Sequence, residues 1–248
     1  MNRRNGLLIF TVAIAICFLY PSSIYAQGGA GESKEKIDES NAPDSSYLAK
    51  FHSIKVVDRL MEDNLNDIYM LKVIVSNFSD KGWDSDYQGV YNGYKKGMEY
   101  YYKRDIVQAR VDLEKNRDDI KNLLKKIIEE YKKETTQMLD ECATKVLTLH
   151  LDATTRSDPD KNDALHLNQM RLKIAYGQLD NSIQASRDHY YKGSIYHLRI
   201  SKSYSIKILE DLSNPDERKG IQDKYKKHKA DNMNRIYGAS EKSAQTAK

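Results

Sequence analysis

Residues 105–151 decide the fold, and they read DIVQARVDLEKNRDDIKNLLKKIIEEYKKETTQMLDECATKVLTLHL. Apolar residues recur three or four positions apart, which is the spacing of one face of an α-helix. This face consists of Ile120, Leu124, Ile127, Tyr131, Met138, Cys142, Val146 and Leu149. Because no proline or glycine interrupts the stretch, we expect one helix about 70 Å long, at about 1.5 Å per residue. The stretch therefore predicts an elongated all-α bundle around a very long central helix.

The composition favours the same fold class. The 248 residues include only 4 prolines and 12 glycines, and 31% of them are charged. Few turn formers and many charges are typical of long helices. We expect five to six long helices, with others over residues 87–102, 163–188, 195–212 and 215–237. Tyrosine is frequent, with 18 residues against 4 phenylalanines, and its amphipathic ring suits thin bundles and interaction surfaces.

The first 26 residues have the pattern of a secretory signal peptide. Arg3 and Arg4 precede a short apolar run, and Ile24-Tyr25-Ala26 fits a cleavage site. We predict a flexible leader over residues 27–45, an elongated helical domain over residues 46–237 and a disordered tail over residues 238–248. The exported chain would then be periplasmic, with no membrane span after signal removal.

The charge and cysteine content exclude two further classes. The formal charge of +4 falls to +2 when Arg3 and Arg4 leave (4 − 2), so we expect no nucleic-acid binding. Cys142 is the only cysteine after the signal, which rules out a disulfide within the mature chain. Its place on the apolar face of the long helix predicts a buried thiol.

A first helix is expected from residue 44 or 45 to residue 78. Its apolar positions follow a heptad, with Asn64 at the one polar core position. They are Ile54, Val57, Met61, Ile68, Leu71, Val75 and Phe78. This pattern predicts packing either within the bundle or against another chain. Gly82 then favours a helix end, and Trp83 beside it is either a buried staple or an exposed contact.

The next expected helix carries Gly89, Gly93 and Gly97 at four-residue intervals, which favours a close helix crossing. Gly97 also falls, with Tyr100, Ala109 and Leu113, at the spacings of a tetratricopeptide-like helical hairpin. A second copy of this hairpin is one interpretation of a partial sequence match. Residues 101–103, 106 and 110 match residues 190–192, 195 and 199 at an offset of 89 (190 − 101), and chance is the other interpretation.

The candidate functional residues are surface contacts and not a chemical site. No histidine array, phosphate loop or nucleophile motif occurs, so we expect no enzyme, no catalytic residue, no cofactor and no metal. Lysines in the last helix are either a solvated face or a docking surface for an acidic partner. The candidate contacts are Trp83, Tyr91, Tyr94, Tyr101, Tyr190, Tyr191, Lys224, Lys226, Lys227 and Lys229.

Three stretches together resemble one protein family. They are the signal end at residues 24–26, the Tyr100-Tyr101-Tyr102-Lys103 cluster and the uninterrupted helix through residues 125–128. In character the chain is similar to spirochete periplasmic flagellar sheath proteins, in particular the flagellar coiling proteins of Leptospira. The resemblance implies a non-catalytic coat on the flagellar filament that helps to impose coiling and supports motility, with flagellin and other sheath proteins as partners. The alternatives are a periplasmic helical adaptor and a chaperone-like binding module.

Overall fold

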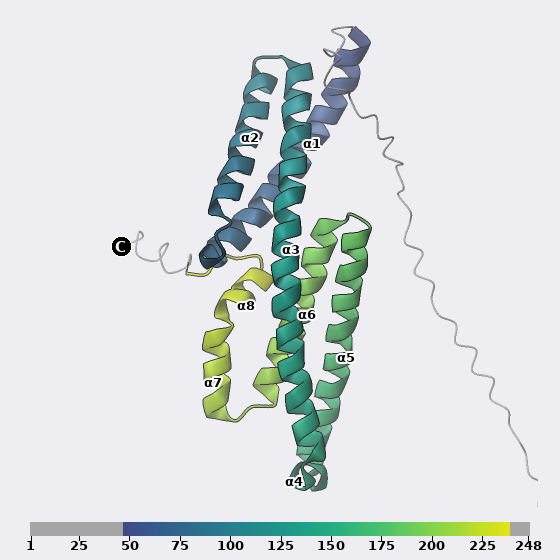
Figure 1. Cartoon of the computed structure of the whole chain (residues 1–248), viewed down its shortest axis with the longest axis vertical. Helices are drawn as coiled ribbons and strands as arrows, with labels where there is room; N and C mark the ends of the chain where they lie inside the picture. Colours follow the sequence, from purple (N-terminus) through teal and green to yellow (C-terminus); the bar gives the residue numbers. More distant parts are fainter. Residues whose placement is uncertain (1–46, 239–248) are drawn as a thin grey trace, which may run out of the picture. The chain divides into compact units, whose positions relative to one another are not determined.

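The computed structural model describes residues 47–238 of the chain, drawn as coloured ribbon in Figure 1. The predicted signal peptide and leader lie outside these residues, as does the predicted tail after Gly238. The described residues form helices α1 (Tyr47–Asn77), η1 (Ser79–Lys81), α2 (Asp84–Tyr102), α3 (Ile106–Leu151), α4 (Ala153–Ser157), α5 (Pro159–Arg187), α6 (Tyr191–Asp211), α7 (Pro215–Lys224) and α8 (Lys226–Asn232), with no strand among them.

The predicted long helix is confirmed as α3, a single helix of 46 residues. It begins where the Asp105 carboxylate accepts a hydrogen bond from the backbone N–H of Gln108 at 3.3 Å, which satisfies an otherwise free donor at the helix start. Seven of the eight residues predicted for its apolar face are buried, and Leu149 at the end is partly buried.

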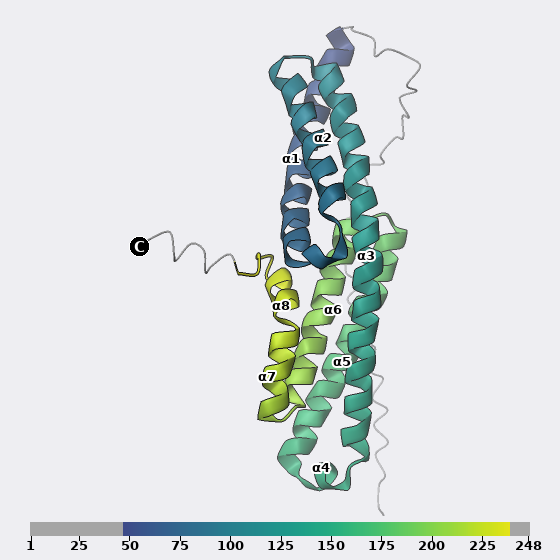
Figure 2. The ribbon, with the colours of Figure 1, turned by 60° about the vertical axis from the view of Figure 1, so that its left-hand side comes forward.

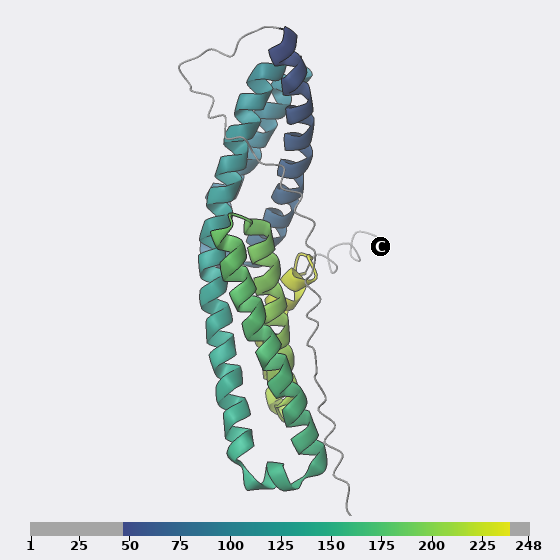
Figure 3. The same cartoon turned by 90° about the vertical axis from the view of Figure 1, so that its right-hand side faces the viewer.

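Two three-helix bundles share α3. The N-terminal bundle consists of α1, α2 and the first part of α3, and the C-terminal bundle consists of α5, α6 and the later part of α3 (Figure 2). Figures 2 and 3 show α1 and α2 beside one stretch of α3, and α5 and α6 beside the other. The short helices α7 and α8 pack on α6, and α8 also reaches α1. The first helix therefore packs within its own chain.

The two hairpins, α2–α3 and α5–α6, turn in the same way. Arg104 and His189 each adopt a left-handed conformation, with φ of 64° and 60°. The next backbone N–H then returns to the helix just ended, from Asp105 to Tyr100 O at 3.0 Å and from Tyr190 to Ala185 O at 2.8 Å. The two turns are thus related by an offset of 85 (189 − 104).

The tandem hairpins therefore exist, but the predicted offset of 89 is wrong. Tyr101 lies in the last turn of α2, whereas Tyr190 caps the start of α6. The sequence match aligned the end of one helix with the beginning of another. The run of two tyrosines and a lysine comes before the turn in the first hairpin and after the turn in the second.

The same offset relates a hydrogen bond across each hairpin. The Asn116 amide donates to Val90 O at 2.6 Å, and the Ser201 hydroxyl donates to Ala175 O at 2.8 Å. Both differences in number are again 85 (201 − 116 and 175 − 90). At the first hairpin, Gly97 faces Leu113 and both residues are buried, so the close crossing predicted there is present at Gly97.

Several local predictions hold and others fail. Asn64 is buried and its amide donates to Leu113 O at 2.9 Å, so the polar heptad position is satisfied inside the bundle. Gly82 ends η1 in a left-handed conformation. Ile54, in contrast, is 43% exposed, and a Cβ on Gly89 would meet nothing within 4 Å. The predicted last helix is two helices, because the chain turns at the buried Tyr225.

A group of charged side chains is buried where the two bundles meet, and we call it the polar joint. The Lys202 ammonium is 2.6 Å from Glu134, and Lys81 is 2.9 Å from the same carboxyl group. Nζ of Lys202 also lies 3.5 Å from the centre of the Tyr131 ring. Burial lowers the pKa of Lys202 below its ordinary value, against the opposing effect of Glu134. Glu134 is therefore the carboxylate that compensates a buried charge.

Helix α8 completes the polar joint with one acidic residue. Asp231 accepts hydrogen bonds from Arg199 at 2.6 and 3.0 Å and from the Tyr131 hydroxyl at 2.8 Å. Next to it, the Asn77 side chain donates to Arg235 O at 2.8 Å and accepts from the Tyr237 N–H at 2.6 Å. These bonds fix the C-terminal end of the described chain against α1, α3 and α6.

Candidate functional site

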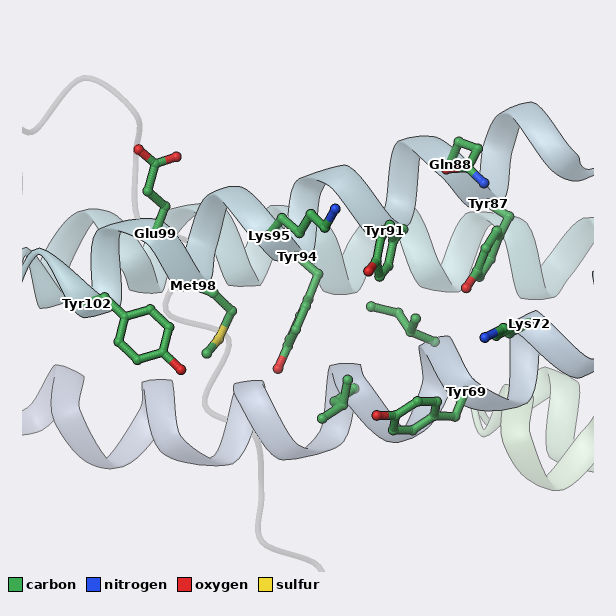
Figure 4. Close-up of a pocket in the computed structure, with 12 residues that line it drawn as sticks. Tyr69, Lys72, Tyr87, Gln88, Tyr91, Tyr94, Lys95, Met98, Glu99 and Tyr102 are labelled. Atoms are coloured by element: carbon green, nitrogen blue, oxygen red, sulfur yellow. The ribbon is translucent and has the colours of Figure 1, made fainter. Parts of the chain in front are cut away.

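A groove between α1 and α2 is lined by tyrosines from both helices. It has a volume of about 630 Å³. Tyr94 extends from α2 toward α1 and the Tyr69 ring lies along α1 on the other side of the space, as Figure 4 shows. The remaining lining residues are Leu65, Ile68, Lys72, Tyr87, Gln88, Tyr91, Lys95, Met98, Glu99 and Tyr102. We call this surface the tyrosine groove.

The groove follows from how α1 sits in the N-terminal bundle. Helix α1 packs more extensively on α3 than on α2, so the apolar sides of α1 and α2 that face each other are incompletely covered. On α2, Tyr87, Tyr91, Met98 and Tyr102 recur at intervals that keep them on one side of the helix. A row of rings therefore borders the opening along most of α2.

The rings combine apolar faces with hydroxyl groups. Tyr87 and Tyr91 stack with their centres 6.3 Å apart and their planes at 15°. Tyr94 is buried, its hydroxyl donates to Met61 O at 3.3 Å, and burial raises its pKa. Tyr69 and Tyr102 are 58% and 76% exposed. Rings of this kind offer contact area at little cost in side-chain entropy, which is why tyrosines are enriched in protein interfaces.

The groove also carries two cations without a carboxylate partner among the described residues. Lys72 lies opposite Tyr87 at one end, and Lys95 extends over the Tyr91 ring with Nζ 4.5 Å from its centre. Glu99, by comparison, pairs with Lys103 at 2.5 Å and points away from the opening (Figure 4). The opening is thus aromatic with a local positive charge, and an occupant with a carboxylate near one end of an apolar surface would match it.

The groove brings together two of the predicted contact residues, of which Tyr91 is 37% exposed and available to a partner, whereas Tyr94 is buried at 9% exposed. It adds Tyr69, Tyr87 and Tyr102, which sequence reasoning did not select as contacts. Tyr87 and Tyr102 could have been selected from their spacing on the same side of α2. Tyr69 could not, because its position opposite α2 depends on the angle at which α1 crosses the bundle.

The other predicted aromatic contacts lie elsewhere. Trp83 and Tyr191 are buried, 8% and 7% exposed, so neither is available to a partner, and Trp83 is the staple and not the exposed contact. Tyr101 is partly buried against the core of the N-terminal bundle. Tyr190 is exposed, with its ring over Gly193, where a Cβ would come within 2.2 Å of the ring.

The four lysines predicted as a docking surface are paired within the chain. The partners come from four different places: Lys224 binds Glu141, Lys226 binds Asp223, Lys227 binds Asp80 and Lys229 binds Glu210. Their charges are therefore locally neutralised, which weakens the case for an acidic partner at this surface. These ion pairs could not be predicted from the sequence, because three of the four carboxylates are 19 or more residues away from their lysines.

Three further features bear on chemistry. Cys142 is a free, buried thiol as predicted, and burial raises its pKa to about 12. Among the described residues, no three histidine, cysteine, aspartate or glutamate side chains group in a way that could hold a metal ion. Within residues 47–238, no helix combines the length and the apolar character needed to cross a membrane.

Comparison with known proteins adds no relative. No protein-family model matches the chain, and no curated protein or solved structure matches it either.

Proposed function

We propose that this chain is a non-catalytic structural component of a periplasmic flagellar sheath, and that the tyrosine groove is one of its contacts in the filament coat. The observation that supports binding to another protein is the groove. It is an aromatic surface with unpaired lysines, and no part of the described chain covers it. The step from an interaction subunit to a flagellar sheath rests on the sequence resemblance alone.

The physical argument concerns rigidity and repetition. Helix α3 connects both bundles without a break, and the polar joint ties α6 and α8 to its middle. When stiff helical subunits repeat along a filament, the many weak lateral contacts between them can together bend the filament. In this proposal, the groove supplies one of these contacts and the long helix keeps the contact points at a fixed spacing.

The test is recovery of the protein with purified filaments. Periplasmic filaments are sheared from cells that express the tagged wild type, and the ratio of this chain to flagellin is measured by quantitative immunoblot. We expect stoichiometric recovery of the wild type and at least about a tenfold loss for Tyr91→Ala/Lys72→Glu, because a few central contacts dominate most interfaces.

The control is Tyr196→Ala, which removes a ring that is 62% exposed on α6, away from the groove. It should be recovered like the wild type. Wild-type protein found only in the soluble periplasm would overturn the sheath proposal and favour the adaptor, which binds one soluble partner in the same groove.

A further inference from the structure

Helix α5 carries apolar side chains on the side that faces away from its bundle. Leu167, Met170 and Ile174 are 48%, 66% and 42% exposed. Intervals of three and four residues place them in one row, on the opposite side from Leu165, which is buried, and Leu172, which packs against the core. When a helix has apolar residues on two opposite sides, its own bundle covers only one of them, and a second surface could cover the other. We call this row the α5 stripe.

The α5 stripe has a carboxylate at one end. Asp163 precedes Leu167 by one turn on the same side of the helix, and it has no ion pair within residues 47–238. Lys72 at one end of the tyrosine groove also has no carboxylate partner there. An apolar row that ends in a free acid therefore complements an aromatic groove that ends in a free base.

The two surfaces also agree in length. Asp163 and Ile174 are 11 residues apart, which is about 16 Å along a helix. The groove follows α2 from Tyr87 to Tyr102, which is 15 residues or about 22 Å. With Asp163 beside Lys72, the apolar part of the stripe would lie along Tyr69 and Tyr91, within the span of the opening.

Pairing of the stripe with its own copy is less favourable. In an antiparallel pair of α5 helices related by a two-fold axis, Met170 of each helix could face Ile174 of the other. The axis would then pass beside residue 172, midway between residues 170 and 174. Lys173 would then lie close to Lys173 of the other copy, and this lysine has no ion pair within the described part of the chain. Like charges at the centre of a contact oppose association.

We propose that the α5 stripe of one copy docks in the tyrosine groove of a second copy. The surfaces belong to different bundles joined by the continuous α3, so they meet only between molecules. Such a contact joins two unlike surfaces and leaves one of each free, so it repeats along a row of subunits. The inference rests on the proposed function, since it names one partner of the proposed coat contact.

The experiment is sedimentation velocity on the full mature chain. Because the stripe is small, we expect weak association, visible between about 5 and 500 µM. The wild-type sedimentation coefficient should rise with concentration and pass the value of a dimer. Met170→Glu and Lys72→Glu should each weaken association at least about tenfold, and Asp163→Lys combined with Lys72→Glu should restore it.

Met233→Glu is the matched control, because Met233 is 63% exposed and lies outside both surfaces. It should associate like the wild type. A monomeric wild type at every concentration would overturn the inference, and so would association that stops at a dimer or that survives Met170→Glu. Circular dichroism of each variant confirms that it is folded.

The two proposals fail in different ways. If the wild type stays monomeric while Tyr91→Ala/Lys72→Glu still loses its recovery with filaments, the groove binds another protein, so the sheath function stands and self-docking is wrong. If self-association follows the pattern above but no chain is found with filaments, self-docking stands and the sheath function is wrong.

Discussion

The two hairpins share a backbone design and differ in the side chains that close it. Each turns through one left-handed residue, and each has one hydrogen bond from its second helix to a carbonyl of its first. In the N-terminal hairpin, Gly97 lets Leu113 approach the helix directly. At the positions of Gly97 and Ala109, the C-terminal hairpin has Ser182 and Ser194, whose hydroxyl oxygens are 2.8 Å apart. The turn and the register thus define the hairpin, and different chemistries can fill its crossing.

The bundles differ more at their surfaces than in their backbones. The N-terminal bundle leaves the tyrosine groove open, whereas the C-terminal bundle exposes the α5 stripe. One bundle therefore offers a concave aromatic surface and the other an exposed apolar row. A repeat of similar parts has acquired two unlike surfaces, which is what assembly in a row requires.

The largest expected effect concerns the polar joint between the bundles. Glu134→Gln removes the carboxylate nearest to the buried Lys202 ammonium and should lower the free energy of unfolding by about 3–5 kcal/mol in urea titrations. Glu130→Gln is the control, because Lys81 keeps its contact with Glu134, and it should cost less than about 1 kcal/mol. Equal losses for the two variants would show that Lys202 does not depend on Glu134.

The close crossing of the N-terminal hairpin gives the next effect. A Cβ on Gly97 would lie 2.7 Å from Cγ of the fully buried Leu113, so Gly97→Val should overpack the crossing. Gly89→Val has the same cost in helix propensity but open space around it. We expect Gly97→Val to be less stable than Gly89→Val by about 3 kcal/mol in the same titrations. Similar stabilities would contradict a tight crossing at Gly97.

Acid should weaken the α8 side of the joint through His228. Its imidazole packs between Phe78 and Tyr225, and burial lowers its pKa from 6.5 to about 4. Between these values only the unfolded chain binds the proton, so stability falls as the pH falls from about 7 to 4. Allowing for partial solvent access, we expect a loss of about 2 kcal/mol.

The measurement is a set of urea titrations across that pH range for the wild type and His228→Phe. The variant keeps every carboxylate, so any difference in slope reports the imidazole. The variant should lose less stability on acidification. Parallel curves for the two proteins would mean that His228 does not titrate differently on folding.

The smallest effect tests the polar crossing of the C-terminal hairpin. Ser182→Ala leaves the buried Ser194 hydroxyl without its partner and should cost about 1 kcal/mol. The double variant Ser182→Ala/Ser194→Ala removes both groups and should be closer in stability to the wild type than the single variant. If the double variant lost as much stability as Ser182→Ala and Ser194→Ala lose together, the two hydroxyls would not be coupled.

The sequence predicts what depends on local spacing. The extent of α3 and its buried face follow from the helical period and from the absence of proline and glycine in the stretch. The burial of Asn64 follows from its heptad position. Contacts between distant residues escape such reasoning. Lys202 has no local sign of burial, and its partner Glu134 is 68 residues away.

The candidate site shows the same division. Tyr91 and Tyr94 are identifiable from the tyrosine-rich helix, but the groove exists because α1 leaves α2 partly uncovered. No local pattern encodes that angle. The lysines near the C-terminus likewise suggest a basic surface in the sequence, because their partners are distant. Lys224, for example, pairs with Glu141, which is 83 residues away.

Disulfide formation between two single-cysteine variants tests the docking of α5 in the groove most directly. Tyr69→Cys places a thiol in the groove and Met170→Cys places one on the stripe, while the native Cys142 stays buried. Mild oxidation of the mixture should give a disulfide-linked dimer of the two variants, far in excess of that from Tyr69→Cys mixed with Met233→Cys. Equal yields from the two mixtures would contradict the docking of the α5 stripe in the tyrosine groove.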